Sequence, residues 1–169
     1  MKSFCWPILV CNCIIGTIHV FAQQDQPAGQ VDVYLYFLDK DQQYLAGEKH
    51  SISGNFSDTY DLGKQLITML IHGPRLGLVK TLPKETQLLA FYISDNGIAY
   101  VDLSKEVSEF HPGGCYTEYL SIYSIVDTLM LNIKEIKGVK VLINGTESPS
   151  LAGHIDLSQL FKVNLLIIR

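Results

Sequence analysis

Cys115 and His111 are the two side chains whose types and spacing come closest to a catalytic pair. Cys115 follows Gly113–Gly114 at the predicted start of a helix, where the helix dipole favours a thiolate. His111 precedes this cysteine in the same loop and offers a base. A nucleophilic cysteine also needs an oriented base and an oxyanion site, and no motif here supplies either. We therefore expect Cys115 to be a small buried residue with a structural role.

Histidines are the second group that could carry chemistry, as ligands of a metal ion. His50, His72, His111 and His154 are spread over a weak predicted strand, a helix end and two loops. None of them forms the HxH, HExxH or CxxC spacing that brings ligands together at one place. Glycine-rich phosphate loops are missing as well. The sequence therefore predicts no catalytic residue, no metal and no cofactor.

Carboxylates are the third group, as acid–base catalysts. The candidates are Asp58, Asp61, Asp102, Glu106, Glu109, Asp127 and Asp156. We expect them at helix caps, strand ends and polar helix faces, where capping and solvation alone account for acidic residues. One sequence does not reveal a facing pair of carboxylates. A cell-wall hydrolase, or its regulator, that uses acidic residues on glycan or peptide therefore stays open as the alternative function.

The N-terminal segment predicts export. Lys2 precedes an apolar run from Phe4 to Ile18, and Val20-Phe21-Ala22 places a small residue directly before Gln23. A charged start, an apolar middle and a small-residue exit are typical of a cleavable signal peptide, here residues 1–22. A retained membrane anchor is one alternative. Lipoprotein processing at Cys11 or Cys13 is the other, although neither cysteine has the preferred small residue before it.

Charge and cysteine content limit the partners of the mature chain. The whole chain carries a formal charge of −4, and loss of Lys2 leaves 12 basic and 17 acidic side chains. This surface repels phosphate backbones, so nucleic acid is not expected as a partner. Cleavage also leaves Cys115 as the single cysteine, which excludes an intramolecular disulfide. No later apolar run is long enough to cross a membrane.

Turn and cap residues divide the mature chain into regular elements. Asp58 is a helix N-cap, Gly73-Pro74 ends that helix, and Asp95-Asn96-Gly97 forms a tight hairpin turn. The predicted elements are a lead-in at 23–30, strands at 31–38 and 48–53, a helix at 58–72, a hairpin of 88–94 with 98–103, a helix at 115–131, a strand at 139–143 and a C-terminal β element within 154–168.

The order is thus β-β-α-β-β-α-β plus a C-terminal β element, which predicts an α+β fold in one domain, residues 31–169. Each helix carries a broad apolar face. We therefore expect a mostly antiparallel or mixed sheet with the two helices packed on one of its faces.

Several segments in this order resemble the GerMN domain family of sporulation and spore germination proteins. The matching stretches are 33–39, a helix that ends in Gly-Pro at 66–74, the step into the hairpin at 82–89, and 96–104, 123–129, 139–145 and 151–157. Lys84-Glu85 stands where the family pattern has glycine, and the second copy of the domain that some members carry is absent.

The resemblance implies an extracytoplasmic, non-enzymatic module, secreted or periplasmic, that is related to ring-building motifs of the cell or spore envelope. Its partners would be envelope or spore-assembly proteins, or a second copy of the chain, with peptidoglycan as another candidate. The family brings no catalytic residues to this sequence. Turn residues such as Gly97 and Gly145 have fold-determining roles at the matched places. We expect association through a strand edge or an open sheet face.

Overall fold

The computed structural model describes residues 29–54 and 58–169. The predicted signal peptide, 1–22, and most of the predicted lead-in lie outside these residues. The elements in chain order are β1 (Gly29–Leu38), β2 (Leu45–Gly54), α1 (Thr59–His72), β3 (Leu88–Ile93), β4 (Ile98–Leu103), α2 (Glu106–Glu109), α3 (Cys115–Asn132), β5 (Gly138–Ile143) and the 3₁₀ turn η1 (Leu165–Ile167). The α+β class and the predicted order of the five strands and the two long helices are confirmed.

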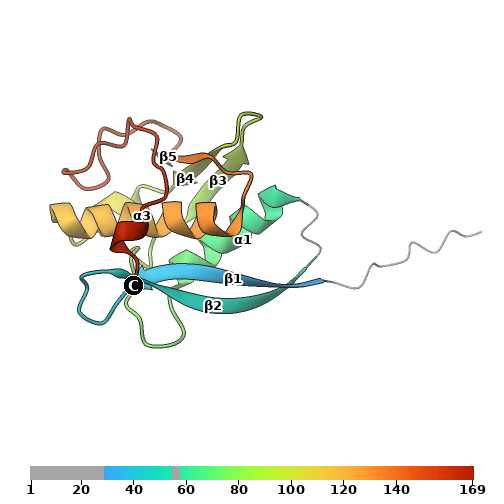
Figure 1. The fold of residues 1–169 in the computed structure, drawn as a ribbon. Coiled ribbons are helices and arrows are strands. Elements are labelled where there is room, and N and C mark those ends of the chain that lie inside the picture. The colour runs from blue at the N-terminus through green and yellow to red at the C-terminus, as the bar shows by residue number, and fades with distance from the viewer. Residues whose placement is uncertain (1–28, 55–57) are drawn as a thin grey trace, which may run out of the picture.

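The strands form two separate sheets in place of the single sheet expected (Figure 1). β1 and β2 form an antiparallel pair, with Gly29 opposite Gly54 and Leu38 opposite Leu45. β3 and β4 pair antiparallel across the predicted turn, and β5 adds to β4 in parallel. The second sheet is therefore mixed. Hydrophobic alternation could place each strand but could not show which strands share a sheet, because pairing depends on contacts distant in sequence.

Both long helices lie between the two sheets, and this corrects the expectation of helices on one face of one sheet. α3 packs against β1 on one side and β5 on the other, whereas α1 packs against β3 and β1. A helix between two sheets must bury more than one stripe. α3 accordingly buries consecutive residues from Ser124 to Leu129, including the polar Asp127 and Thr128.

Local signals set the ends of α1. The Asp58 carboxylate accepts a hydrogen bond from the N–H of Tyr60 at 2.8 Å, as an N-cap should. Gly73 ends the helix in the left-handed region, with φ of 97°. Gly63 sits where α1 approaches β3, and a Cβ there would lie 2.3 Å from the ring of Phe91. This glycine is therefore required by close packing.

The C-terminal segment departs most from the prediction. In place of a continuous strand it makes isolated bridges, of Phe161 with Val139 and of Ile168 with Leu45, and ends in η1. The other differences are smaller: β1 begins at Gly29, β2 extends from Leu45 to Gly54, and the short helix α2 was not predicted. Across 29–54 and 58–169, no helix combines the length and apolar character needed for a membrane crossing.

Candidate functional site

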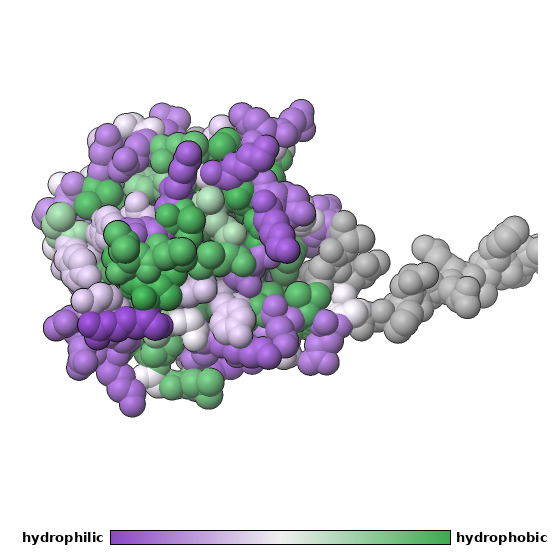
Figure 2. Space-filling view, in the orientation of Figure 1, coloured by the Kyte–Doolittle hydropathy of each residue, from purple (hydrophilic) through white to green (hydrophobic). Residues whose placement is uncertain are grey.

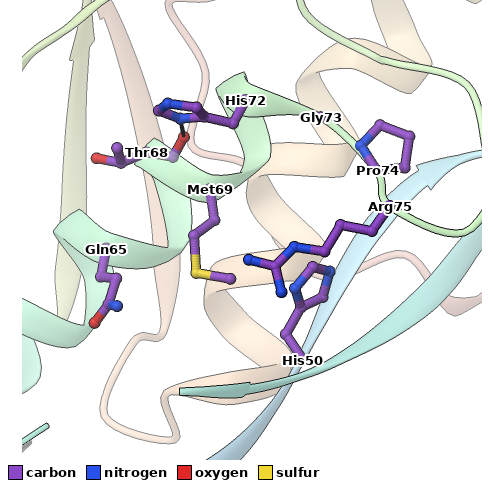
Figure 3. A pocket seen from close by; sticks show the side chains of 8 residues that line it. All are labelled: His50, Gln65, Thr68, Met69, His72, Gly73, Pro74 and Arg75. Atoms are coloured by element: carbon purple, nitrogen blue, oxygen red, sulfur yellow. Dashed lines mark hydrogen bonds between the residues drawn. The ribbon is translucent and has the colours of Figure 1, made fainter. Parts of the chain in front are cut away.

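A hollow of about 530 Å³ opens between β2 and the C-terminal half of α1. Its wall consists of His50 from β2, Gln65, Thr68, Met69 and His72 from α1, and the turn Gly73–Arg75 (Figure 3). We call it the His50 hollow. Every titratable side chain on this wall is basic, in a chain whose overall charge is −4. The hollow therefore differs in charge character from the protein as a whole.

His50 is held at the base of this hollow by a buried carboxylate. The Glu48 and His50 side chains are only 1 % and 3 % exposed, and His50 Nε2 lies 2.7 Å from Glu48 Oε1. A carboxylate only accepts hydrogen bonds, so Nε2 carries the hydrogen. Nδ1, the other ring nitrogen, is buried and has no partner in the part of the chain that the structure describes. A ligand in the hollow could satisfy it.

Glu48 also fixes the turn that follows α1. Its two oxygens accept hydrogen bonds from the backbone N–H of Arg75, at 2.9 and 3.1 Å, and of Leu76, at 2.8 Å. Burial alone would raise the pKa of Glu48, but these two amides and the His50 ring outweigh it and lower the pKa of the carboxyl. The carboxylate is thus ionised and fully engaged.

Arg75 adds the strongest hydrogen-bond donor to the hollow. Its exposed side chain turns back from the turn toward the His50 ring. On the α1 side of the wall, His72 Nδ1 donates a hydrogen bond to the carbonyl of Thr68 at 2.7 Å. This nitrogen is therefore not available to a ligand. A guanidinium without an acidic partner among the described residues is suited to bind an anionic group.

The predicted pair of Cys115 and His111 does not form a catalytic site. Cys115 is exposed, which corrects the expectation that it is buried. His111 has both nitrogens engaged: Nδ1 accepts from the N–H of Gly113 at 3.0 Å, and Nε2 lies 3.0 Å from Ser121 Oγ. Burial lowers the pKa of His111, which favours its neutral form. His111 therefore serves to hold its loop on α3.

Most of the candidate carboxylates have local partners. Asp58 caps α1, Asp102 accepts from the N–H of Gly145 at 2.8 Å, and Asp156 accepts from that of Ser158 at 2.8 Å. Glu109 pairs with Lys105 in an exposed bridge. Asp61 lies exposed in the first turn of α1, and Glu106 lies half-buried in that of α2.

Asp127 is the exception, because it lies in the core and not on a polar helix face. Its side chain is fully buried in α3, where Oδ1 accepts from the N–H of Asn164 at 2.9 Å and Oδ2 has no partner among the described residues. Burial raises the pKa of Asp127 to about 7. The C-terminal segment covers this carboxyl, so Asp127 faces no hollow.

A second buried glutamate, which the sequence did not single out, repeats the arrangement of Glu48. Glu118 in α3 is inaccessible and accepts from the N–H groups of Leu151 at 2.9 Å, His154 at 3.0 Å and Ile155 at 3.0 Å. Burial again opposes ionisation, but backbone amides within 152–155 and the His154 ring, 3.2 Å from Oε2, outweigh it and lower the pKa of Glu118. Both glutamates fix a loop to the core. Among residues 29–54 and 58–169, no cluster of three or more metal-binding side chains occurs.

The outer edge of β1 is occupied from Tyr34 to Leu38. Leu38 exchanges backbone hydrogen bonds of 3.0 and 2.9 Å with Val79, so alternate residues of β1 direct their N–H and C=O away from β2. Further along this edge, the side chain of Asn132 bonds to Tyr34: it accepts from the N–H at 2.9 Å and donates to the carbonyl at 2.7 Å. Between them, the hydroxyl of Thr128 accepts from the N–H of Tyr36 at 3.1 Å. Side chains of α3 thus replace a neighbouring strand.

The outer edge of β2 is open over most of its length. The register places Gly47, Lys49 and Ser51 opposite the outward-facing positions of β1, so their backbone groups also point away from the pair. Leu45, at the start of β2, bonds to the N–H of Arg169 at 2.9 Å. Beyond Leu45, no backbone hydrogen bond joins this edge to another segment of the described chain.

Comparison with known sequences decides the family. The sequence profile of the Germane family, described as sporulation and spore germination, matches residues 34–149. The chain belongs to the Germane family. Among curated protein sequences, none matches this chain. The Germane match includes Glu48 and His50 of the hollow, and Thr128 and Asn132 that close the edge of β1.

Solved structures resemble this Germane domain over most of its length. A candidate lipoprotein from Clostridium perfringens is 32 % identical, with a TM-score of 0.57 over 79 % of this chain and 88 % of that one. The first GerMN domain of the Bacillus subtilis sporulation protein GerM is 22 % identical, with a TM-score of 0.58 over 78 % and 97 %. The tandem GerMN domains of the same protein are 16 % identical, with a TM-score of 0.51 over 82 % and 46 %. The last two similarities concern the fold.

Proposed function

We propose that this chain is a non-catalytic, extracytoplasmic module of the bacterial envelope that takes part in assembly by pairing a protein strand with the outer edge of β2. The observation that carries the proposal is the contrast between the two edges of the first sheet. Thr128 and Asn132 close the edge of β1 at Tyr36 and Tyr34, whereas no described residue forms a backbone hydrogen bond with the edge of β2 from Gly47 onward. An exposed row of backbone donors and acceptors is a template for strand addition.

Membership of a sporulation and germination family supports a role in envelope assembly, and the lipoprotein relative supports a place outside the cytoplasm. The surface around β2 is mainly hydrophilic, with Lys49 and Ser51 exposed, whereas hydrophobic side chains gather over η1 (Figure 2). Charged and polar side chains on an open edge suppress unspecific aggregation and leave the edge to a matched partner.

The alternative is a hydrolase that acts on glycan or peptide through acidic residues. The observation in its favour is the Glu48–His50 pair beside a hollow, since a carboxylate can orient a histidine base. Against it, both oxygens of Glu48 are engaged by amides and Asp127 is covered by the C-terminal segment. Incubation with purified peptidoglycan discriminates the two functions. The binding function predicts no soluble fragments, and fragments lost on changing His50→Gln would establish the hydrolase.

The edge is tested by Ser51→Pro in the native host, with Ser51→Ala as the matched control. Ser51 directs its N–H away from β1, so proline removes a donor that a partner needs without breaking the β1–β2 ladder. Both variants lose the same hydroxyl bond to Asp32. We expect Ser51→Pro, and not Ser51→Ala, to shift the extracted protein from a large complex to the monomer in sedimentation. A complex that survives Ser51→Pro at normal protein levels contradicts the proposal.

A further inference from the structure

The His50 hollow and the open edge of β2 are neighbours, because His50 belongs to β2 itself. Side chains of β2 alternate, with Glu48 and His50 directed inward and Lys49 and Ser51 directed outward. α1 packs on β1, so the hollow occupies the space left between α1 and the inner face of β2. A strand added to the edge would continue this sheet and direct every second side chain to the same inner face.

The position next to His50 on such a strand would therefore face the hollow. Opposed side chains of neighbouring strands have Cβ atoms about 4.5–5.5 Å apart. A short acidic side chain at that position reaches the groups around the His50 ring. Its carboxylate would meet the Arg75 guanidinium, a donor with no acidic partner among the described residues.

Charge in the hollow favours an acid over a neutral side chain. The Arg75 guanidinium forms no ion pair among the described residues, so its positive charge is uncompensated in the hollow. Every nitrogen of the guanidinium is a donor, and carboxylate oxygens only accept. The Gln65 amide supplies a further donor on the α1 side.

We propose that the His50 hollow receives an Asp or Glu side chain from an extended protein segment that pairs with the outer edge of β2. This specification rests on the proposed function and names the chemistry of the partner. Backbone pairing at the edge would supply affinity for any strand, whereas the hollow would select the strand that carries an acid at one inward position.

The test uses two capped peptides of alternating Thr and Val that differ only in a central Glu or Gln. Binding to the exported protein is followed by the NMR signals of the β2 amides and of the His50 ring nitrogens. We expect the Glu peptide to bind about tenfold more tightly, because a charge-assisted contact replaces a neutral one. Its binding should move the Nδ1 signal of His50, and the Gln peptide should move it far less.

Arg75→Gln is the decisive variant, because Glu48 binds the backbone N–H of residue 75 and that bond survives any substitution except proline. In this variant the two peptides should bind with about equal affinity, because the affinity of the Glu peptide falls and that of the Gln peptide does not change. Lys162→Gln removes an equal charge from an exposed site outside the hollow and should change neither.

The two proposals fail in different ways. Ser51→Pro should weaken both peptides alike, and if it weakens neither, edge pairing is wrong. If the wild-type protein binds the two peptides equally and Ser51→Pro still weakens both, only the proposal that the hollow selects an acidic side chain is overturned. Inorganic phosphate provides the last arm: if it binds the hollow as tightly as the Glu peptide does, the site is a general anion site and the carboxylate assignment is overturned.

Discussion

Asn132, the last residue of α3, hydrogen-bonds both backbone groups of Tyr34 in β1, at 2.9 Å to the N–H and 2.7 Å to the carbonyl. One side-chain amide thus does what a paired strand residue does. One turn earlier in α3, the hydroxyl of Thr128 accepts a hydrogen bond from the N–H of Tyr36. This pair of helix residues links α3 to the first sheet and closes the middle of the β1 edge, whereas the matching stretch of β2 has no backbone partner among the described residues.

The first prediction concerns Thr128→Val, which keeps the shape of the side chain and removes its hydroxyl. The N–H of Tyr36 then has no acceptor, so we expect a loss of about 1–2 kcal/mol in the free energy of unfolding and faster hydrogen exchange at Tyr36. Thr68→Val is the control, because that hydroxyl bonds only to the carbonyl of Lys64 within its own helix. Equal effects of the two substitutions would show that the strand contact contributes nothing.

The second prediction concerns Glu118→Gln. The carboxylate accepts from three backbone amides without exposure to solvent, and an amide nitrogen in its place would face donors. We expect a loss of about 2–3 kcal/mol at pH 7, measured by urea unfolding. Glu109→Gln, in an exposed bridge with Lys105, should change stability by less than about 0.5 kcal/mol.

The pH dependence of that loss has a defined sign. The pKa of Glu118 is lowered in the folded protein, so its stabilising effect is present above the ordinary value of 4.5 and is lost as the pH falls through the folded value. The wild-type protein and Glu118→Gln should therefore converge in stability below pH 4.5. A difference that stays constant to lower pH would show that the charge of Glu118 has no part in it.

The third prediction concerns Asp127, whose raised pKa has the opposite consequence. The unfolded chain releases this proton near pH 3.8 and the folded protein near pH 7, so stability falls as the pH rises between these values. Asp127→Asn keeps an acceptor for the N–H of Asn164 and removes the titration. Relative to wild type, the variant should gain about 2–4 kcal/mol between pH 4 and pH 8 in urea unfolding. Parallel stability curves for the two proteins would contradict the assignment.

The sequence predicted the elements well where local chemistry decides them. The Asp58 cap and the Gly73 terminus of α1 depend only on neighbours along the chain, and so does the Asn96-Gly97 turn. The arrangement of the sheets could not be predicted in this way. It depends on contacts such as Asn132 with Tyr34, which are 98 residues apart.

The His50 hollow was missed for the same reason. Glu48 and His50 stand two residues apart in a strand, a spacing that puts both on one face, and this was the available signal. Their burial, however, depends on the turn at Arg75, 27 residues further along the chain. Glu118 was missed likewise, because an acidic residue in the first turn of a helix is common. Its burial depends on the loop at 151–155, which is distant in sequence.

The last prediction concerns Cys115, which the structure places at the exposed start of α3. An exposed thiol contributes little to folding, so Cys115→Ser should change the free energy of unfolding by less than about 0.5 kcal/mol. The thiol should react with a maleimide in the native protein as completely as in urea. If Cys115→Ser unfolds the protein, or if the native thiol resists labelling, then Cys115 is packed as the sequence had suggested. Ser51→Pro in a Cys115→Ser background should still dissociate the complex, because the edge of β2 and this thiol act independently.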